Sequence, residues 1–220
     1  GIPEIAEQII IERDLRLLEQ YKTKYHIALI SSKKSIDLIK SAKEKGIKFT
    51  VGVSINNLSL NDNDIGDFRT FLKLSPPLRS EDDRLALIQA VNDGIIDVIV
   101  SDHKPEDEES KRLTFQQATT GASGIETLLP LALELVHNNL CDLNTVIKKL
   151  TSNPAKILGV RNGTLSVGGE ADIAIFDLEK PWVLKKENIQ SKSKNTAIEN
   201  RKLQGKVEKT FINGKLVFNN

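Results

Sequence analysis

The sequence predicts an α/β protein with a parallel sheet, followed by a small β-rich module. Up to residue 100, short apolar tracts alternate with stretches of helical periodicity. Strand, helix and strand follow one another within about 30 residues, the order of a βαβ unit with parallel strands. Beyond residue 160, polar and apolar side chains alternate and the turn dipeptides GG and NG occur.

Each element of the α/β part has a local signal. Apolar residues recur at helical spacing in residues 4–20, and Gly46 stops a second helix. Ser80 is a predicted N-cap and Gly94 a predicted stop for a third. The predicted elements are a helix over 4–20, a strand over 25–31, a helix ending at Gly46, a strand over 47–53, a helix from Ser80 to Gly94 and a strand over 95–100.

A loop of some 20 residues follows residue 101, and long loops of this kind are often functional. Helices resume in "GIETLLPLALELVHNN" and "DLNTVIKKLTSNPAKILG". The sequence therefore predicts an α/β portion over residues 1–160 and a β-module over residues 161–220.

The α/β portion supplies three or four parallel strands, whereas an eight-stranded (β/α)8 barrel needs about 250 residues. It is either a small open sheet or the back portion of a barrel. The chain contains no Met and begins at Gly1, directly before a helical pattern. We therefore expect a piece of something longer, which favours the barrel.

Composition excludes several classes of partner. Lys plus Arg (31) and Asp plus Glu (30) nearly cancel, so we expect neither nucleic acid nor an anionic membrane as a partner. No apolar run approaches the roughly 20 residues of a membrane span. Cys141 is the single cysteine and indicates a reducing compartment, so we expect a cytoplasmic protein.

Asp102 and His103 follow the last predicted strand, at the edge where parallel sheets place their chemistry. A carboxylate there could bind a metal or move a proton, but a catalytic metal centre needs three or more converging ligands. Of the other two histidines, His26 opens a strand and predicts a hydrogen-bonded structural imidazole. His137 comes late in a helix and predicts a solvated or helix-terminal role.

Two further segments have weaker signals. The carboxylate run "PEDEES" is typical of a solvated loop. The segment "TTGASG" could present backbone N–H groups to an anion, because its glycines let the chain approach closely.

A series of motifs resembles the dihydroorotases of the amidohydrolase superfamily, in family order over essentially the whole chain. They are "SPPLRSEDDR", "GIIDVIVSDHKP", "TGASGIETLLPLAL", "LTSNPAKILGV", "GTLSVGGEADIAIFDL" and "KNTAIENRKLQGKV". The resemblance implies a (β/α)8 barrel of the TIM type, with 25–31, 47–53 and 95–100 as its last three strands, plus a β-module. It also implies zinc-activated water and the reversible hydrolysis of dihydroorotate to N-carbamoyl-L-aspartate in pyrimidine biosynthesis.

The resemblance also assigns roles to residues of the predicted site. Asp102 matches the strand-eight aspartate, which binds metal and shuttles a proton. The segment Gly121, Ala122, Ser123 and Gly124 matches a loop whose backbone helps to hold the substrate. The other metal ligands, including an HxH motif, would precede Gly1.

The chain departs from the family pattern at four places. Leu29 stands where a metal-binding histidine is expected, and an alkyl side chain offers a metal no lone pair. The family's "PHH" is "INN" at Ile55–Asn57. At two substrate-holding positions, Ser75 replaces an asparagine and Glu106 a histidine.

The stretches "GVSINNLSLNDNDIGDFRTFLKLSPPLR" and "KRLTFQQA" are similar to divergent bacterial dihydroorotase-like proteins that associate with aspartate carbamoyltransferase. This similarity implies a pseudoenzyme: a non-catalytic partner of that enzyme, without zinc and able to form homo-oligomers. The alternative is an active zinc-dependent dihydroorotase whose remaining ligands lie in the N-terminal part, with dihydroorotate or carbamoyl aspartate as ligands. Hydantoinases and allantoinases are a further alternative. In each case we expect the 220-residue chain alone to be inactive.

Overall fold

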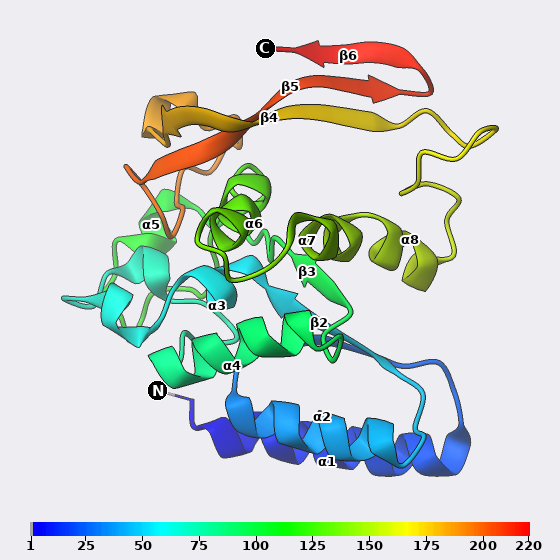
Figure 1. The fold of residues 1–220 in the computed structure, drawn as a ribbon. Helices are drawn as coiled ribbons and strands as arrows, with labels where there is room; N and C mark the ends of the chain where they lie inside the picture. The colour runs from blue at the N-terminus through cyan, green and yellow to red at the C-terminus, as the bar shows by residue number, and fades with distance from the viewer. Residues whose placement is uncertain (1) are drawn as a thin grey trace. The chain divides into compact units, whose positions relative to one another are not determined.

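The computed structural model describes residues 2–220, which form two compact units (Figure 1). The first unit extends to Ile125 and also contains Ser191–Ala197. The second contains Glu126–Gln190 and Ile198–Asn220. The division at residue 160 that the sequence predicts stays a prediction.

The first unit is built around a parallel sheet of three strands in the order β1-β2-β3. Two βαβ crossovers connect them, as the sequence predicts, and the α/β fold class is confirmed. The elements are α1 (Glu4–Tyr21), β1 (His26–Ile30), α2 (Lys33–Glu44), β2 (Thr50–Ser54), α3 (Ile55–Ser59), the 3-10 turns η1 (Asp62–Ile65) and η2 (Thr70–Leu72), α4 (Glu81–Asn92), β3 (Val98–Val100) and α5 (Glu108–Lys111).

The central strand β2 lies in the core of this unit. Val51 and Val53 are fully buried, as expected of a parallel strand that is covered on both faces. Helices α1 and α2 lie side by side (Figure 1), and α1 buries Ile11, Leu15 and Leu18. Apolar residues at helical spacing therefore produce the layer that covers the sheet.

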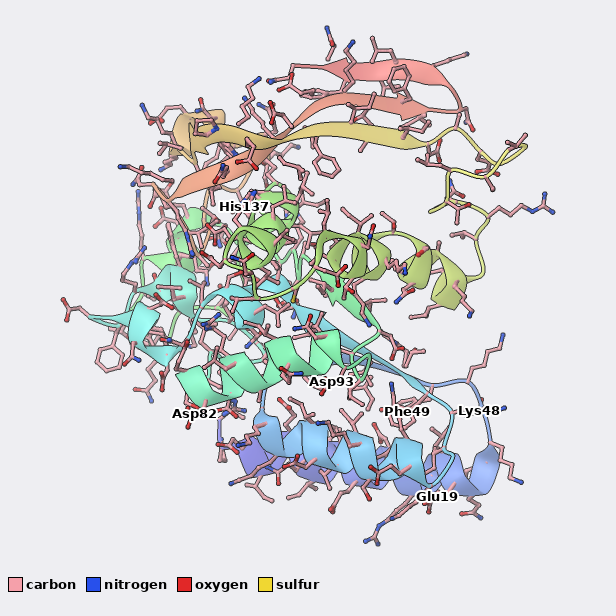
Figure 2. All side chains as sticks on the ribbon, viewed as in Figure 1. Glu19, Lys48, Phe49, Asp82, Asp93 and His137 are labelled. Atoms are coloured by element: carbon pink, nitrogen blue, oxygen red, sulfur yellow. The ribbon has the colours of Figure 1, made fainter. Side chains whose placement is uncertain are left out.

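Local sequence signals set the ends of α4. The Ser80 side chain accepts a hydrogen bond from the Asp83 backbone N–H, which confirms the predicted N-cap. Gly94 has φ 74°, a left-handed conformation that glycine adopts without steric cost. Figure 2 shows Asp82 and Asp93 at opposite ends of this helix.

A half-buried carboxylate fixes the turn after β1. Glu7 of α1 accepts hydrogen bonds from the Ser31 backbone N–H at 3.0 Å and from the Ser31 and Ser35 hydroxyls. Asp83 of α4 accepts from the Lys33 backbone N–H at 2.8 Å. The first turn of α2 is therefore held by two neighbouring helices.

The last strand is shorter than the predicted 95–100. The Ile95 and Ile96 backbone N–H groups both donate to Ala90 O, at 3.0 and 3.1 Å, and so extend the end of α4. Asp97 pairs with Val51 partly through its side chain, because the Val51 N–H donates to the carboxylate at 2.8 Å. Regular strand pairing therefore begins only at Val98.

The second unit contains helices followed by an antiparallel sheet in the order β4-β5-β6, so the β-rich segment is confirmed. Gly205 lies where the sheet meets α6, and a Cβ there would be 2.3 Å from Leu133 Cδ1. The elements are α6 (Leu128–His137), α7 (Leu143–Leu150), α8 (Ser152–Leu158), β4 (Ile173–Val183), the 3-10 turn η3 (Lys186–Asn188), β5 (Lys202–Ile212) and β6 (Lys215–Asn219).

Among residues 2–220, no helix combines the length and the apolar character that a membrane crossing requires.

Gly52 of β2 provides a test of the sheet packing. A Cβ at Gly52 would lie 2.3 Å from Ala28 O, a backbone atom that cannot move alone. We expect Gly52→Ala to lower the free energy of unfolding by about 2–3 kcal/mol through overpacking, measured by urea denaturation. The control is Gly46→Ala, where φ is 82° but no atom lies within 4 Å of the added Cβ; it should cost about 1 kcal/mol. Equal losses would contradict this account of the β1–β2 contact.

Candidate functional site

The candidate site lies at the carboxyl ends of β2 and β3, which end at Ser54 and Val100. Parallel strands bring the segments that follow them to one edge of the sheet. Within the first unit, the segments around Ser75, Asp102 and Gly121 come together there, through the contacts given below. Each of these segments was predicted from the sequence to contribute to the site.

The Asp102 carboxylate is the central charge of the site. Its side chain is only 7% exposed, and its backbone has φ 47°, a left-handed conformation that Asp tolerates better than most residues. Burial raises the pKa of the Asp102 carboxyl, and the hydrogen bond and positive charge of Lys104 act in the opposite direction.

Lys104 connects two loops of the site. Its Nζ lies 3.2 Å from Asp102 Oδ1 and donates to Ser75 O at 3.0 Å. The Lys104 side chain remains 47% exposed. Ser75 therefore contributes its backbone carbonyl to the cluster in this arrangement, and its predicted role in holding a substrate stays a prediction.

The segment Gly121–Gly124 packs directly against the loop that contains Asp102. All four residues are buried, and the Lys104 backbone N–H donates to Ala122 O at 2.9 Å. A Cβ at Gly121 would lie 2.7 Å from Lys104 O, and one at Gly124 would lie 2.4 Å from Ser101 O. The two glycines are therefore needed for this close approach.

Most backbone N–H groups of this segment donate within the protein. Gly121 N donates to Lys73 O at 2.9 Å, and Ser123 N to Asn195 O at 2.7 Å. Gly124 N donates to Nδ1 of His103 at 3.1 Å, so this ring nitrogen carries no proton here. The predicted binding of a substrate by the backbone of Gly121, Ala122, Ser123 and Gly124 stays a prediction.

Asn195 is a positioning residue that the sequence reasoning did not identify. Its side chain is buried; Oδ1 accepts from the Glu106 N–H at 3.3 Å and Nδ2 donates to Gly121 O at 3.3 Å. Its signal was the motif "KNTAIENRKLQGKV", which supported the resemblance but gave no role. Asn195 holds the segments around Glu106 and Gly121 at a fixed distance.

A buried lysine also connects the segments that follow β2 and β3. Lys111 is 2% exposed, and its Nζ donates to Thr119 O at 2.7 Å and to Thr70 O at 3.1 Å. Burial lowers the pKa of Lys111 to about 8, although the Glu106 charge opposes this. No sequence pattern indicates this burial, because a lysine in a charged segment is ordinarily exposed.

The remaining predicted residues lie in other surroundings. His26 Nδ1 lies 2.7 Å from Thr50 Oγ1, which confirms a hydrogen-bonded structural imidazole. His137 is the last residue of α6 (Figure 2), as expected of a helix-terminal histidine. Leu29 lies in β1, half-buried, and Asn57 Nδ2 donates to Pro77 O at 3.0 Å.

The described residues do not by themselves fit a zinc ion. Among residues 2–220, no group of three or more His, Cys, Asp or Glu side chains is placed to hold a metal. Leu29 has no donor atom, and His103 Nδ1 already accepts a hydrogen bond. Asp102 is therefore a single carboxylate ligand where catalytic zinc requires three protein ligands.

The two hydrogen bonds of the Asn195 side chain, which we call the Asn195 clamp, predict a local change in amide hydrogen exchange when this side chain is removed. In Asn195→Ala, the Glu106 N–H loses its acceptor, and we expect its amide hydrogen exchange to accelerate about 10-fold, with a loss of about 1–3 kcal/mol in unfolding free energy. Exchange measured by NMR or mass spectrometry gives the first value and urea denaturation the second. Asn63→Ala is the control, since Asn63 is exposed. Unchanged exchange at Glu106 would show that the side chain does not act as a clamp.

The lowered pKa of Lys111 predicts that the folded protein becomes more stable as the pH rises. Its pKa of about 8 lies below the ordinary 10.5, so between these values the unfolded chain binds the proton more tightly than the folded chain does. The unfolding free energy should therefore gain roughly 1–2 kcal/mol between about pH 8 and 9.5. This gain should vanish in Lys111→Met and persist in Lys45→Met, an exposed lysine. Urea denaturation across that range measures it, and a gain retained in Lys111→Met would refute the assignment.

Comparison with known proteins identifies the family. The model of the amidohydrolase family matches residues 6–217. Dihydroorotases of Anaplasma phagocytophilum and Ehrlichia canis are each 41% identical over 99% of this chain. The chain spans about half the length of these curated relatives, 49% in each case.

A solved structure supports the same assignment. The L-hydantoinase (dihydropyrimidinase) of Arthrobacter aurescens superimposes with a TM-score of 0.93 and 26% identity, over 98% of this chain and 49% of its own. The three parallel strands thus correspond to part of a TIM-barrel amidohydrolase, as the sequence predicts. The chain belongs to the amidohydrolase family and is dihydroorotase-like within it.

Proposed function

We propose that the chain belongs to a dihydroorotase-like protein of pyrimidine biosynthesis that does not hydrolyse dihydroorotate. It acts in the cytoplasm as a structural partner of aspartate carbamoyltransferase. The observation that supports this proposal is Leu29, which stands in β1 where the family pattern has an imidazole and offers no donor atom to a metal. A site that lacks one imidazole ligand holds zinc less firmly and activates water less well than the family's full ligand set.

The rigidity of the loops also supports a structural role. Asn195, Lys104 and Lys111 tie the segments after β2 and β3 to one another by hydrogen bonds to backbone groups. Surfaces that bind a partner protein generally change little on binding. Loops fixed in this way can present a constant surface without any ligand in the site.

A second candidate function is an active zinc-dependent dihydroorotase. It is favoured by the 41% identity to proteins named dihydroorotase, which are twice as long as this chain. The position of Asp102 after β3 is also that of the family's aspartate. In this case the missing donors would lie outside the present chain, and dihydroorotate or carbamoyl aspartate would be its ligands.

Zinc content and ring opening distinguish the two candidates. We expect the purified full-length protein to hold substoichiometric zinc and to show no turnover of dihydroorotate in either direction. Leu29→His is the matched variant, because it restores one imidazole donor and should raise zinc retention. Metal analysis and absorbance assays measure both. One zinc per chain together with turnover would establish the second candidate instead.

Association with aspartate carbamoyltransferase is tested separately. We expect the two proteins to elute together in size-exclusion chromatography, with a mass by light scattering that also gives any homo-oligomer. Separate elution at micromolar concentration, with the carbamoyltransferase fully assembled and active alone, would refute the structural role.

A further inference from the structure

The Asp102 carboxylate requires a compensating positive charge. Its side chain is 7% exposed, and an unpaired ionised group in such surroundings costs several kcal/mol. In a metal-dependent member of the family the metal supplies this charge. Here the cation at the carboxylate belongs to the chain itself, since Lys104 Nζ lies 3.2 Å from Asp102 Oδ1.

Lys104 is held in place both at its backbone and at its ammonium group. The Lys104 backbone N–H donates to Ala122 O at 2.9 Å, and Gly121 approaches so closely that an added Cβ would be 2.9 Å from Lys104 Cβ. At the other end, Nζ donates to Ser75 O at 3.0 Å. Because backbone groups of two other loops define its position, Lys104 is built into the site.

The same geometry opposes a metal ion at Asp102. A divalent cation bound to Oδ1 would be close to the ammonium, and like charges at such a short separation repel each other. Leu29 offers no donor that could compensate, and Gly124 N occupies Nδ1 of His103. A metal could bind only if Lys104 first left the carboxylate.

We propose that Lys104 is a resident cation that takes the place of a metal at Asp102, holds its loop folded and excludes zinc. The ion pair follows from the geometry alone, whereas the exclusion of zinc rests on the proposed function. Lys104 is thus a positioning residue whose ammonium group stands where metal-dependent members of the family have a metal ion.

A double-mutant cycle on the full-length protein tests the pair. Lys104→Met should lower Tm by about 4–8 °C, because it leaves the Asp102 charge uncompensated. In the Asp102→Asn background, which lacks that charge, the same substitution should have little effect. Lys104→Arg should keep most of the stability. Equal losses in both backgrounds would mean that Lys104 acts through packing alone and would overturn the proposal.

Zinc is the second readout. Added Zn²⁺ should raise the Tm of the double variant Leu29→His and Lys104→Met, which restores an imidazole donor and removes the ammonium, and it should leave the wild type and Lys48→Met unchanged. Lys48 is an exposed lysine between α2 and β2 (Figure 2). Stabilisation of Leu29→His alone by zinc as large as that of the double variant would overturn the proposal, as would zinc having no effect on the double variant.

The two proposals can fail separately. A protein that does not associate with aspartate carbamoyltransferase would refute the structural role and leave the cycle between Asp102 and Lys104 unaffected. A cycle without coupling would refute the resident cation, whatever the chromatography shows.

Discussion

The buried charge of Asp102 is the constraint on which the candidate site depends. An ionised carboxylate at 7% exposure is costly in a folded protein unless a partner compensates its charge. The partner is Lys104, whose ammonium also binds Ser75 O and whose backbone binds Ala122 O. One ion pair therefore couples the loops after β2 and β3 to the glycine-containing segment, and none of the three can move without disturbing the others.

Asn195 completes this arrangement from a distant part of the sequence. Residues 191–197 belong to the first compact unit although they follow the helices of the second. A neutral amide suits the position, because Glu106 N needs an acceptor and Gly121 O needs a donor. A carboxylate or an ammonium could satisfy only one of the two. The Asn195 side chain therefore connects the segments around Glu106 and Gly121 without adding a charge to either.

The features that could be predicted from the sequence are those that local patterns determine. The βαβ order, the Ser80 cap and the positions of Asp102 and Leu29 could all be read from spacing, turn chemistry or family motifs. The shortened β3 could not, because Asp97 uses its side chain to pair with Val51, nearly fifty positions earlier. Lys111 and Asn195 were missed for a similar reason: their carbonyl and amide partners come together only when separate loops meet. Nothing in the immediate sequence of either residue shows that burial.

In the non-catalytic role proposed above, the difference between an ammonium and a zinc ion accounts for a fold that is kept without the family's chemistry. Zn²⁺ lowers the pKa of bound water to near 7, because a divalent ion with an open coordination position binds hydroxide directly. The Lys104 ammonium has a single charge and three donors, two of which already face Asp102 and Ser75 O. It can compensate a carboxylate, but it has no coordination position for hydroxide. A cation at Asp102 can hold the loops together and, when it is zinc, activate water, whereas the Lys104 ammonium can do only the first.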